Sequence, residues 1–115
     1  MVQEKRGHAN IQDVSTNTIH NAIVENLKQV YDPEISVNIY DLGLIYDIDI
    51  QESKCNITMS LTSAFCPAAD DIVNDVRGAA FNVVGIESVN VDVTFNPQWG
   101  PELMSDDAKL LLGIF

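Results

Sequence analysis

Three segments of this chain alternate between apolar and polar residues, and each is predicted to be apolar on one side only. They span residues 44–50, 55–61 and 89–95. A period of two is typical of a strand with one buried face. Such strands form a sheet that needs helices on its apolar face alone, so we predict two layers. The short polar stretch at residues 51–54 predicts an antiparallel hairpin between the first two strands.

Two helices are predicted to cover this apolar face. The first begins with Ser15 or Thr16 as its N-cap and ends before Pro33. The second spans residues 67–84, and Gly85 fits the residue that stops it. A helix that connects two strands most economically joins parallel neighbours. The predicted fold class is therefore α+β, a two-layer sandwich with an α-β-β-α-β core and both helices on one face of a small mixed sheet.

The two ends of the chain give further expectations. Residues 1–14 are polar and predict a mobile N-terminal arm, which leaves residues 15–115 as a single domain. Ser105, followed by two aspartates, predicts the start of a short C-terminal helix, and Gly113 predicts its end.

Charge and cysteine content exclude several classes of protein. The formal net charge is −11, with only six Lys and Arg residues, so we expect no electrostatic binding to nucleic acid or to an anionic membrane. No apolar run approaches the roughly 20 residues that a membrane-spanning helix needs. Charged residues near the N-terminus exclude a secretory signal. The two cysteines form no CxxC pair, so we expect a cytoplasmic protein with free thiols.

The junction between the second strand and the second helix carries the most reactive candidate. With Pro67 at the first helical position, Cys66 is predicted as the N-cap, where unpaired N–H groups and the helix dipole favour a thiolate. A thiolate attacks electrophiles and binds soft metals. Cys55, on the apolar side of the second strand, is instead predicted to be buried. His8 and His20 offer no obvious base for a Cys-His pair. Cys66 is thus a metal ligand, a nucleophile or a small apolar filler.

An acidic motif, Asp32-Pro33-Glu34, marks the end of the first helix. Two carboxylates beside a rigid proline supply hard metal ligands or a general base. The simpler interpretation is a solvated turn that stops the helix, and the residue pattern alone favours that turn.

Four motifs follow one another along the chain. They are Val30-Tyr31-Asp32-Pro33-Glu34, Asp41-Leu42-Gly43-Leu44-Ile45-Tyr46, Leu61-Thr62-Ser63-Ala64-Phe65-Cys66-Pro67, and an ending with Phe95-Asn96-Pro97-Gln98-Trp99, Met104-Ser105 and residues 108–113. Together they resemble the metal–sulfur cluster assembly factor family, which includes SufT-like and PaaD-like proteins. The resemblance covers about residues 18–113. No cysteine-rich tail follows the last motif, so the SufT-like branch fits better than the PaaD-like branch.

The resemblance implies an iron–sulfur cluster assembly or transfer factor that helps to mature apoproteins and is not an enzyme. It assigns Cys66 as a transient metal ligand. Asp32 and Glu34 match the family's acidic motif, and Thr62 matches the threonine that ends the second strand. A single cysteine does not complete the usual four-cysteine shell of a cluster. We therefore expect a labile iron–sulfur cluster that either two chains share as a homodimer or Cys66 holds during a hand-off.

The implied partners are iron–sulfur scaffold or carrier proteins and client apoproteins. The alternative function is a metal-free adaptor that recruits clients to the assembly machinery through the polar sheet face or the Trp99 loop. A thiol-dependent enzyme is the third and weakest option, because it requires a Cys66 pKa well below the ordinary value of about 8.5.

Overall fold

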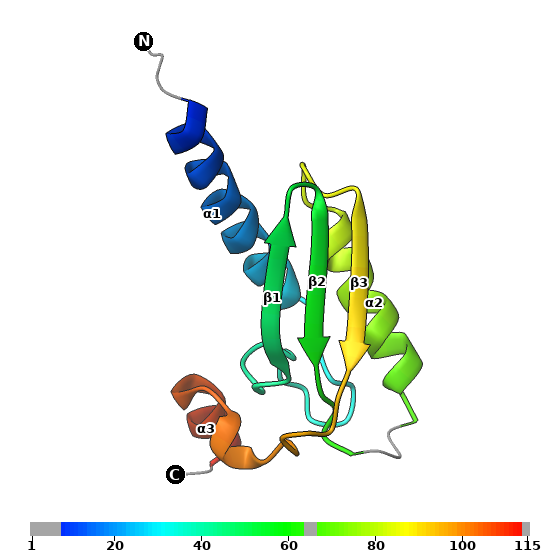
Figure 1. The fold of residues 1–115 in the computed structure, drawn as a ribbon. Helices are drawn as coiled ribbons and strands as arrows, with labels where there is room; N and C mark the ends of the chain where they lie inside the picture. The colour runs from blue at the N-terminus through cyan, green and yellow to red at the C-terminus, as the bar shows by residue number, and fades with distance from the viewer. Residues whose placement is uncertain (1–7, 64–66, 114–115) are drawn as a thin grey trace.

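The structure is a computed structural model that describes residues 8–63 and 67–113. Its helices and strands follow the predicted order, with one additional 3₁₀ turn before the last helix (Figure 1). The elements are α1 (His8–Leu27), β1 (Ile45–Gln51), β2 (Lys54–Met59), α2 (Ala69–Phe81), β3 (Ser88–Val93), the 3₁₀ turn η1 (Pro101–Leu103) and α3 (Asp106–Leu112).

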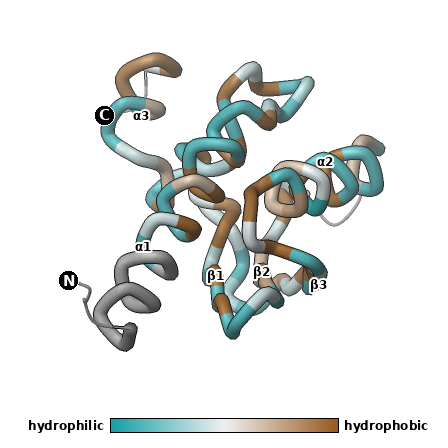
Figure 2. The backbone as a smooth tube through the Cα atoms, turned by 90° about the horizontal axis from the view of Figure 1, so that it is seen from above, coloured by the Kyte–Doolittle hydropathy of each residue, from teal (hydrophilic) through white to brown (hydrophobic). Residues whose placement is uncertain are grey.

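The three strands form one mixed sheet in the order β1-β2-β3. β1 pairs antiparallel with β2, and β2 pairs parallel with β3. Figure 1 looks onto the open face of the sheet, with α1 crossing behind β1 and α2 lying behind β3. Seen from above, in Figure 2, neither helix crosses that open face. The predicted α+β two-layer sandwich is therefore confirmed.

The core lies between the sheet and the two helices. β2 is the central strand, and the side chains of Cys55, Ile57 and Met59 on its inner face are almost completely buried. α1 contributes Ile23 and Leu27, which expose no surface. The inner face of α2 is formed by Ile72, Val76 and Ala80. Each large aliphatic side chain buried in this way contributes roughly 1.5–3 kcal/mol, so burial of one sheet face dominates the stability of the fold.

The start of β1 departs from the predicted alternation. The register shifts between Ile45, which lies opposite Met59, and Asp47, which lies opposite Thr58. Tyr46 is therefore the extra residue of a β-bulge. Its side chain was predicted on the apolar face, and this is wrong, because Ile45 takes that face instead. The Tyr46 hydroxyl donates a hydrogen bond to the carbonyl oxygen of Pro97 at 2.8 Å, in an exposed position.

The first helix starts earlier than predicted. α1 begins at His8, so Ser15 and Thr16 lie inside the helix and the predicted N-cap is wrong. Residues 8–14 of the predicted mobile arm are helical, and residues 1–7 of that arm lie outside the described residues. Among the described residues, no helix has the length and apolar character required to cross a membrane.

The second helix is shorter than predicted at both ends. It begins at Ala69, with Ala68 as an N-cap that makes no side-chain hydrogen bond. Pro67 therefore lies in the turn before the helix, and the prediction that Cys66 is the N-cap is wrong. The helix ends at Phe81, and Gly85 adopts its positive φ of 103° in the connection to β3 and not directly after the helix.

The predicted C-terminal helix is confirmed with both of its caps. The Ser105 side chain accepts a hydrogen bond from the backbone N–H of Ala108 at 3.1 Å, and Gly113 ends α3 in the left-handed conformation. The segment before α3 crosses back to the loop that precedes β1. There the Trp99 indole N–H donates to the carbonyl oxygen of Leu42 at 2.7 Å.

Asn26 joins the two long helices through one hydrogen bond. Its Nδ2 donates to the carbonyl oxygen of Ala79 at 2.9 Å. That carbonyl lies in the last turn of α2, where the backbone N–H of Val83 bonds Ala80 instead. We expect Asn26→Ala to lower the free energy of unfolding by about 1–2 kcal/mol, because it leaves a half-buried carbonyl without a donor. Urea unfolding measures the loss, and an equal loss in the exposed control Asn82→Ala would contradict this assignment.

Candidate functional site

Two of the predicted site segments meet at one end of the sheet, where β1 begins and β2 and β3 end (Figure 1). Residues 28–44 connect α1 to β1 and carry the acidic motif, and residues 60–63 follow β2. The backbone N–H of Ser60 donates to the carbonyl oxygen of Leu44 at 2.8 Å, which ties the two loops together. β2 ends at Met59, so Thr62 lies in a bend beyond the strand and does not end it as predicted.

Asp32 is the anchor of the acidic motif. Its side chain is only 1% exposed, and Oδ1 accepts hydrogen bonds from the backbone N–H groups of Glu34 at 2.8 Å and Ile35 at 3.2 Å. Its own backbone bonds Val37 and Ser36 at 3.1 and 2.9 Å. The interpretation of this residue as part of a solvated turn is therefore wrong. A buried carboxylate that accepts backbone N–H groups holds the loop in one conformation.

Glu34 has the opposite environment. Its side chain is exposed, and its backbone N–H is held by Asp32. The two carboxylates of the motif therefore differ in what they do: Asp32 fixes the turn, whereas Glu34 presents a charge to solvent at this end of the sheet.

The second half of the same loop is held by contacts that the sequence did not indicate. Asn38 and Asp41 bond each other twice, with Nδ2 donating to the Asp41 carboxylate and the Asp41 N–H donating to the Asn38 side chain, both at 2.8 Å. The backbone N–H of Ser105 donates to the carbonyl oxygen of Asp41 at 2.8 Å. Gly43 has a φ of 82°, and a Cβ there would overlap the backbone of Leu103. The C-terminal segment therefore clamps the loop that carries the acidic motif.

Cys66, the predicted metal ligand, lies outside the described residues. The described chain stops at Ser63 and resumes at Pro67, at the same end of the sheet as the acidic loop (Figure 1). Within residues 8–63 and 67–113, no three His, Cys, Asp or Glu side chains are grouped closely enough to hold a metal ion.

The second cysteine is buried, as predicted. Cys55 is 2% exposed on the inner face of β2. Burial, and to a smaller extent the nearby charge of Asp49, raises the pKa of its thiol. Because metal binding and nucleophilic attack both need the thiolate, Cys55 is unsuited to either role at neutral pH.

The raised pKa of Cys55 predicts a loss of stability at alkaline pH. The folded chain retains a proton that the unfolded chain releases near pH 8.5, so the free energy of unfolding falls as the pH rises above that value. The fall is at most about 1.4 kcal/mol per pH unit, in the interval between the pKa of the thiol in the unfolded chain and that in the folded chain. Denaturant unfolding of the parent and of Cys55→Ala between pH 7 and 10 measures it. We expect the free energy of unfolding of Cys55→Ala to fall less steeply with pH than that of the parent. Parallel curves for the two chains would contradict a raised pKa of Cys55.

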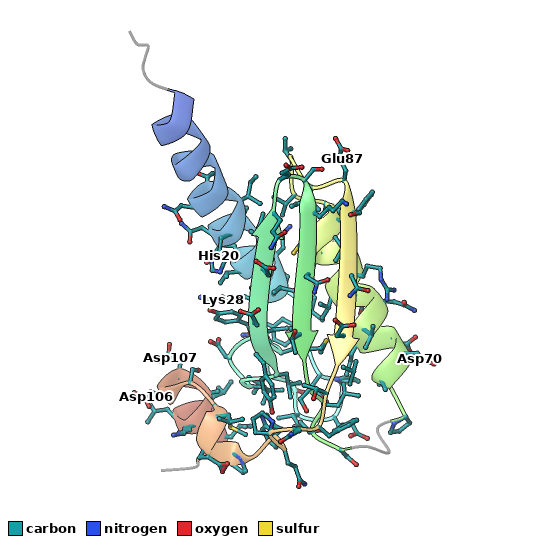
Figure 3. The ribbon with its side chains drawn as sticks, in the orientation of Figure 1. His20, Lys28, Asp70, Glu87, Asp106 and Asp107 are labelled. Carbon is teal, nitrogen blue, oxygen red and sulfur yellow. The ribbon has the colours of Figure 1, made fainter. Side chains whose placement is uncertain are left out.

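His20 lies far from the start of the second helix. His20 on α1 and Asp70 in the first turn of α2 lie on opposite sides of the molecule (Figure 3). His20 is therefore not placed to act as a base at the turn that contains Pro67. The exposed carboxylates of Asp70 and Asp71 in that first turn stabilise the helix dipole. They also disfavour ionisation of any thiol placed close to them.

Comparisons with known proteins agree on one family. A family model described as "Iron-sulfur cluster assembly protein" matches residues 20–93. A curated relative from Porphyromonas gingivalis, named "Fe-S protein maturation auxiliary factor", is 50% identical over 79% of this chain and 88% of its own length. A second, from Staphylococcus aureus, is named "Fe-S protein maturation auxiliary factor SufT" and is 34% identical over 74% of this chain and 98% of its own.

The fold has a close match among solved structures. A crystal structure of a domain of unknown function, DUF59, from Bacillus anthracis superposes with a TM-score of 0.79 at 40% sequence identity. The superposition covers 86% of this chain and 95% of the other. The match therefore extends over most of this chain.

Proposed function

Because this chain belongs to the iron–sulfur cluster assembly protein family, we propose that it assembles iron–sulfur clusters or transfers them to apoproteins. The observation that carries the proposal is the family match over residues 20–93, since it includes the acidic motif, the sheet and the segment with Cys66. The cluster is cargo in this scheme. The chain acts as a carrier or helper without catalytic turnover, and we place its work in the cytoplasm, where thiols stay reduced.

Cys66 is the residue that we propose to touch the cargo. Iron in clusters prefers thiolate, and a bound metal deprotonates its cysteine ligand whatever the nearby carboxylates do. Cys55 is buried with a raised pKa, which leaves Cys66 as the remaining candidate of the two cysteines in the sequence.

One cysteine per chain requires other ligands for a cluster. Either a second copy of the chain supplies a second cysteine in a homodimer, or an iron–sulfur scaffold or carrier protein and the client apoprotein supply the rest during a hand-off. Glu34, in the Asp32 turn, and Thr62, in the bend after β2, are proposed to contact the cargo or the partner at this end of the sheet. Weak binding by one chain suits a carrier, because the cargo has to be released.

The proposal predicts that loss of Cys66 stops transfer without affecting the fold. We expect Cys66→Ser to lower the rate of cluster transfer to an apoprotein roughly tenfold or more, because a hydroxyl replaces the thiolate that we propose as the ligand of the cargo. The protein is incubated with iron and sulfide, and transfer is followed by the visible absorbance of the client. Cys55→Ala is the matched control and is expected to transfer as the parent does. Undiminished transfer by Cys66→Ser would remove this residue from the mechanism.

A metal-free adaptor is the second candidate function. The open sheet face favours it, since Asp47, Asp49 and Asp92 are exposed and neither long helix crosses that face (Figure 2). The Trp99 loop is less suited to this role than predicted, because the indole is half-buried and bonds Leu42 within the chain. Client binding that survives Cys66→Ser, together with unchanged client maturation, would favour the adaptor over the carrier.

A further inference from the structure

The outer edge of β3 carries backbone groups that no described strand pairs. β3 is the last strand in the order β1-β2-β3. The backbone N–H groups of Ser88 and Thr94 point to the β2 side, where they donate to Ser53 and Met59. Because successive residues of a strand point their backbone groups to alternate sides, those of Val89, Val91 and Val93 point away from the sheet.

The two edges of the sheet differ in their ability to accept another strand. The edge strand β1 carries the bulge between Ile45 and Asp47, which interrupts regular pairing. β3 pairs with β2 in continuous register over six residues, without a shift. The chain after β3 turns back toward β1 and leaves the outer side of β3 uncovered (Figure 1). β3 is therefore the regular and accessible edge.

An apolar groove of about 380 Å³ lies beside this edge, between α2 and β3. Phe81 of α2 lines it and is 54% exposed. Val89 of β3 forms the opposite wall, and farther along the same edge Val93 is 40% exposed. The groove lies on the helix side of the sheet, which is the side that receives every second side chain of an added strand.

A helical glycine keeps this groove open. Gly78 lies in the middle of α2, where glycine costs about 1 kcal/mol relative to alanine. It has no positive φ, and a Cβ built on it would meet no described atom within 4 Å. The described chain therefore gives no packing or backbone reason for glycine, whereas a side chain entering the groove from outside would use the space.

Charge indicates what kind of strand this edge accepts. On the open face, the outermost side chains of the sheet are Ser88, Asn90 and Asp92, and Asn90 bonds Asn56 of β2 at 3.0 Å. An added strand would place its polar side chains beside Asp92, in a chain with a net charge of −11. Arg77 borders the groove on the other side of the sheet and disfavours a second cation there. A second copy of this chain would bring like charge against like charge.

We propose that the β3 edge binds an extended segment of a partner protein as a fourth strand. The segment alternates apolar residues, which enter the groove beside Phe81, with basic residues, which lie beside Asp92 on the open face. Strand addition of this kind gains affinity from main-chain hydrogen bonds and specificity from the alternate side chains. The site lies on the strand edge and not at the acidic loop, so Cys66→Ser is expected to bind the segment as well as the parent does.

A synthetic peptide of about six residues, the length of β3, tests the proposal. The peptide alternates lysine and valine, and its control has the same residues in two blocks. Titration into the ¹⁵N-labelled chain is expected to shift and protect the amide signals of Val89, Val91 and Val93 with the alternating peptide. Equal binding of both peptides, or shifts confined to other parts of the chain, would overturn the proposal.

Two variants block the site in different ways. Val93→Pro removes an outward N–H that β2 does not use, whereas Val93→Thr keeps it and is the matched control. Gly78→Leu places a side chain in the groove from a Cβ that meets no described atom within 4 Å, and Val84→Leu, at a residue that is 92% exposed and outside the groove, is its control. We expect both blocking variants to raise the dissociation constant for the alternating peptide roughly tenfold or more, and tenfold corresponds to about 1.4 kcal/mol of binding free energy.

The remaining outcomes also decide the question. Unchanged binding in Gly78→Leu overturns the proposal even if Val93→Pro fails to fold, because Gly78→Leu leaves the residues of the strand unchanged. The free chain could also sediment as a dimer, and Val93→Pro could dissociate that dimer. This result would show that a second copy of the chain occupies the edge, and it would overturn the proposal.

Discussion

Gly43→Ala is expected to lower the free energy of unfolding by about 3 kcal/mol. The left-handed conformation at φ 82° costs a residue with a Cβ about 1–2 kcal/mol. The Cβ would also overlap the backbone carbonyl of Leu103, which does not move as a flexible side chain would. The C-terminal segment therefore has to shift away from the loop before β1, which loosens the contact between Trp99 and Leu42.

Thermal unfolding and tryptophan fluorescence measure this effect together. We expect the midpoint to fall by about 15 °C, and the emission of Trp99, the only tryptophan, to shift toward that of a solvated indole. Gly78→Ala is the matched control, because its Cβ meets no described atom within 4 Å. It is expected to be neutral or to stabilise the chain by up to about 1 kcal/mol. A Gly43→Ala chain as stable as the parent would contradict the claim that the C-terminal segment holds this loop through its contact at Gly43.

Asp32→Ala is expected to cost about 3 kcal/mol and to release the acidic loop. The substitution leaves the backbone N–H groups of Glu34 and Ile35 without their acceptor in a nearly inaccessible place. Hydrogen bonds to a charged acceptor contribute about 1.5–3 kcal/mol each to stability. Part of this loss is offset when the loop opens, because water then hydrogen-bonds to the freed N–H groups. Hydrogen exchange should show faster exchange of these two amides, and urea unfolding should show the loss of stability.

Asp32→Asn separates the hydrogen bonds from the charge. The amide oxygen still accepts from both N–H groups, so we expect Asp32→Asn to retain more than half of the stability that Asp32→Ala loses. Equal losses in the two variants would show that the negative charge, and not the acceptor geometry, holds the loop. Cluster transfer by a folded Asp32→Asn chain then reports whether the charge also acts on the cargo or the partner.

The sheet was predictable because burial of one face imposes its own period on the sequence. Residues 55–59 alternate so strictly that the central strand and its inner face follow directly. The bulge at Tyr46 was not predictable in this way, because Ile45 and Tyr46 are both apolar and either suits the inner face. The start of α1 was missed because residues 8–14 contain only two large apolar residues, Ile11 and Val14, which are too few to establish a stripe.

Only part of the geometry around the candidate site was predictable from the sequence. The sequence Asp32-Pro33-Glu34 is compatible with an Asx turn, in which the side chain of an aspartate accepts hydrogen bonds from the backbone N–H groups two and three residues later. This signal was available in the sequence. The close contact between Gly43 and Leu103 could not be predicted from the sequence, because the two residues are sixty positions apart in the chain. Contacts of that separation depend on the tertiary fold and leave no local pattern.

The central claim, that this chain moves iron–sulfur clusters, is tested most directly by the rate of cluster transfer. A scaffold protein loaded with cluster is mixed with an apoprotein, with and without this chain at catalytic and stoichiometric ratios, and client activity is followed over time. The account predicts faster transfer in the presence of the parent chain and no acceleration by Cys66→Ser. A transfer rate that the parent chain does not change would contradict it.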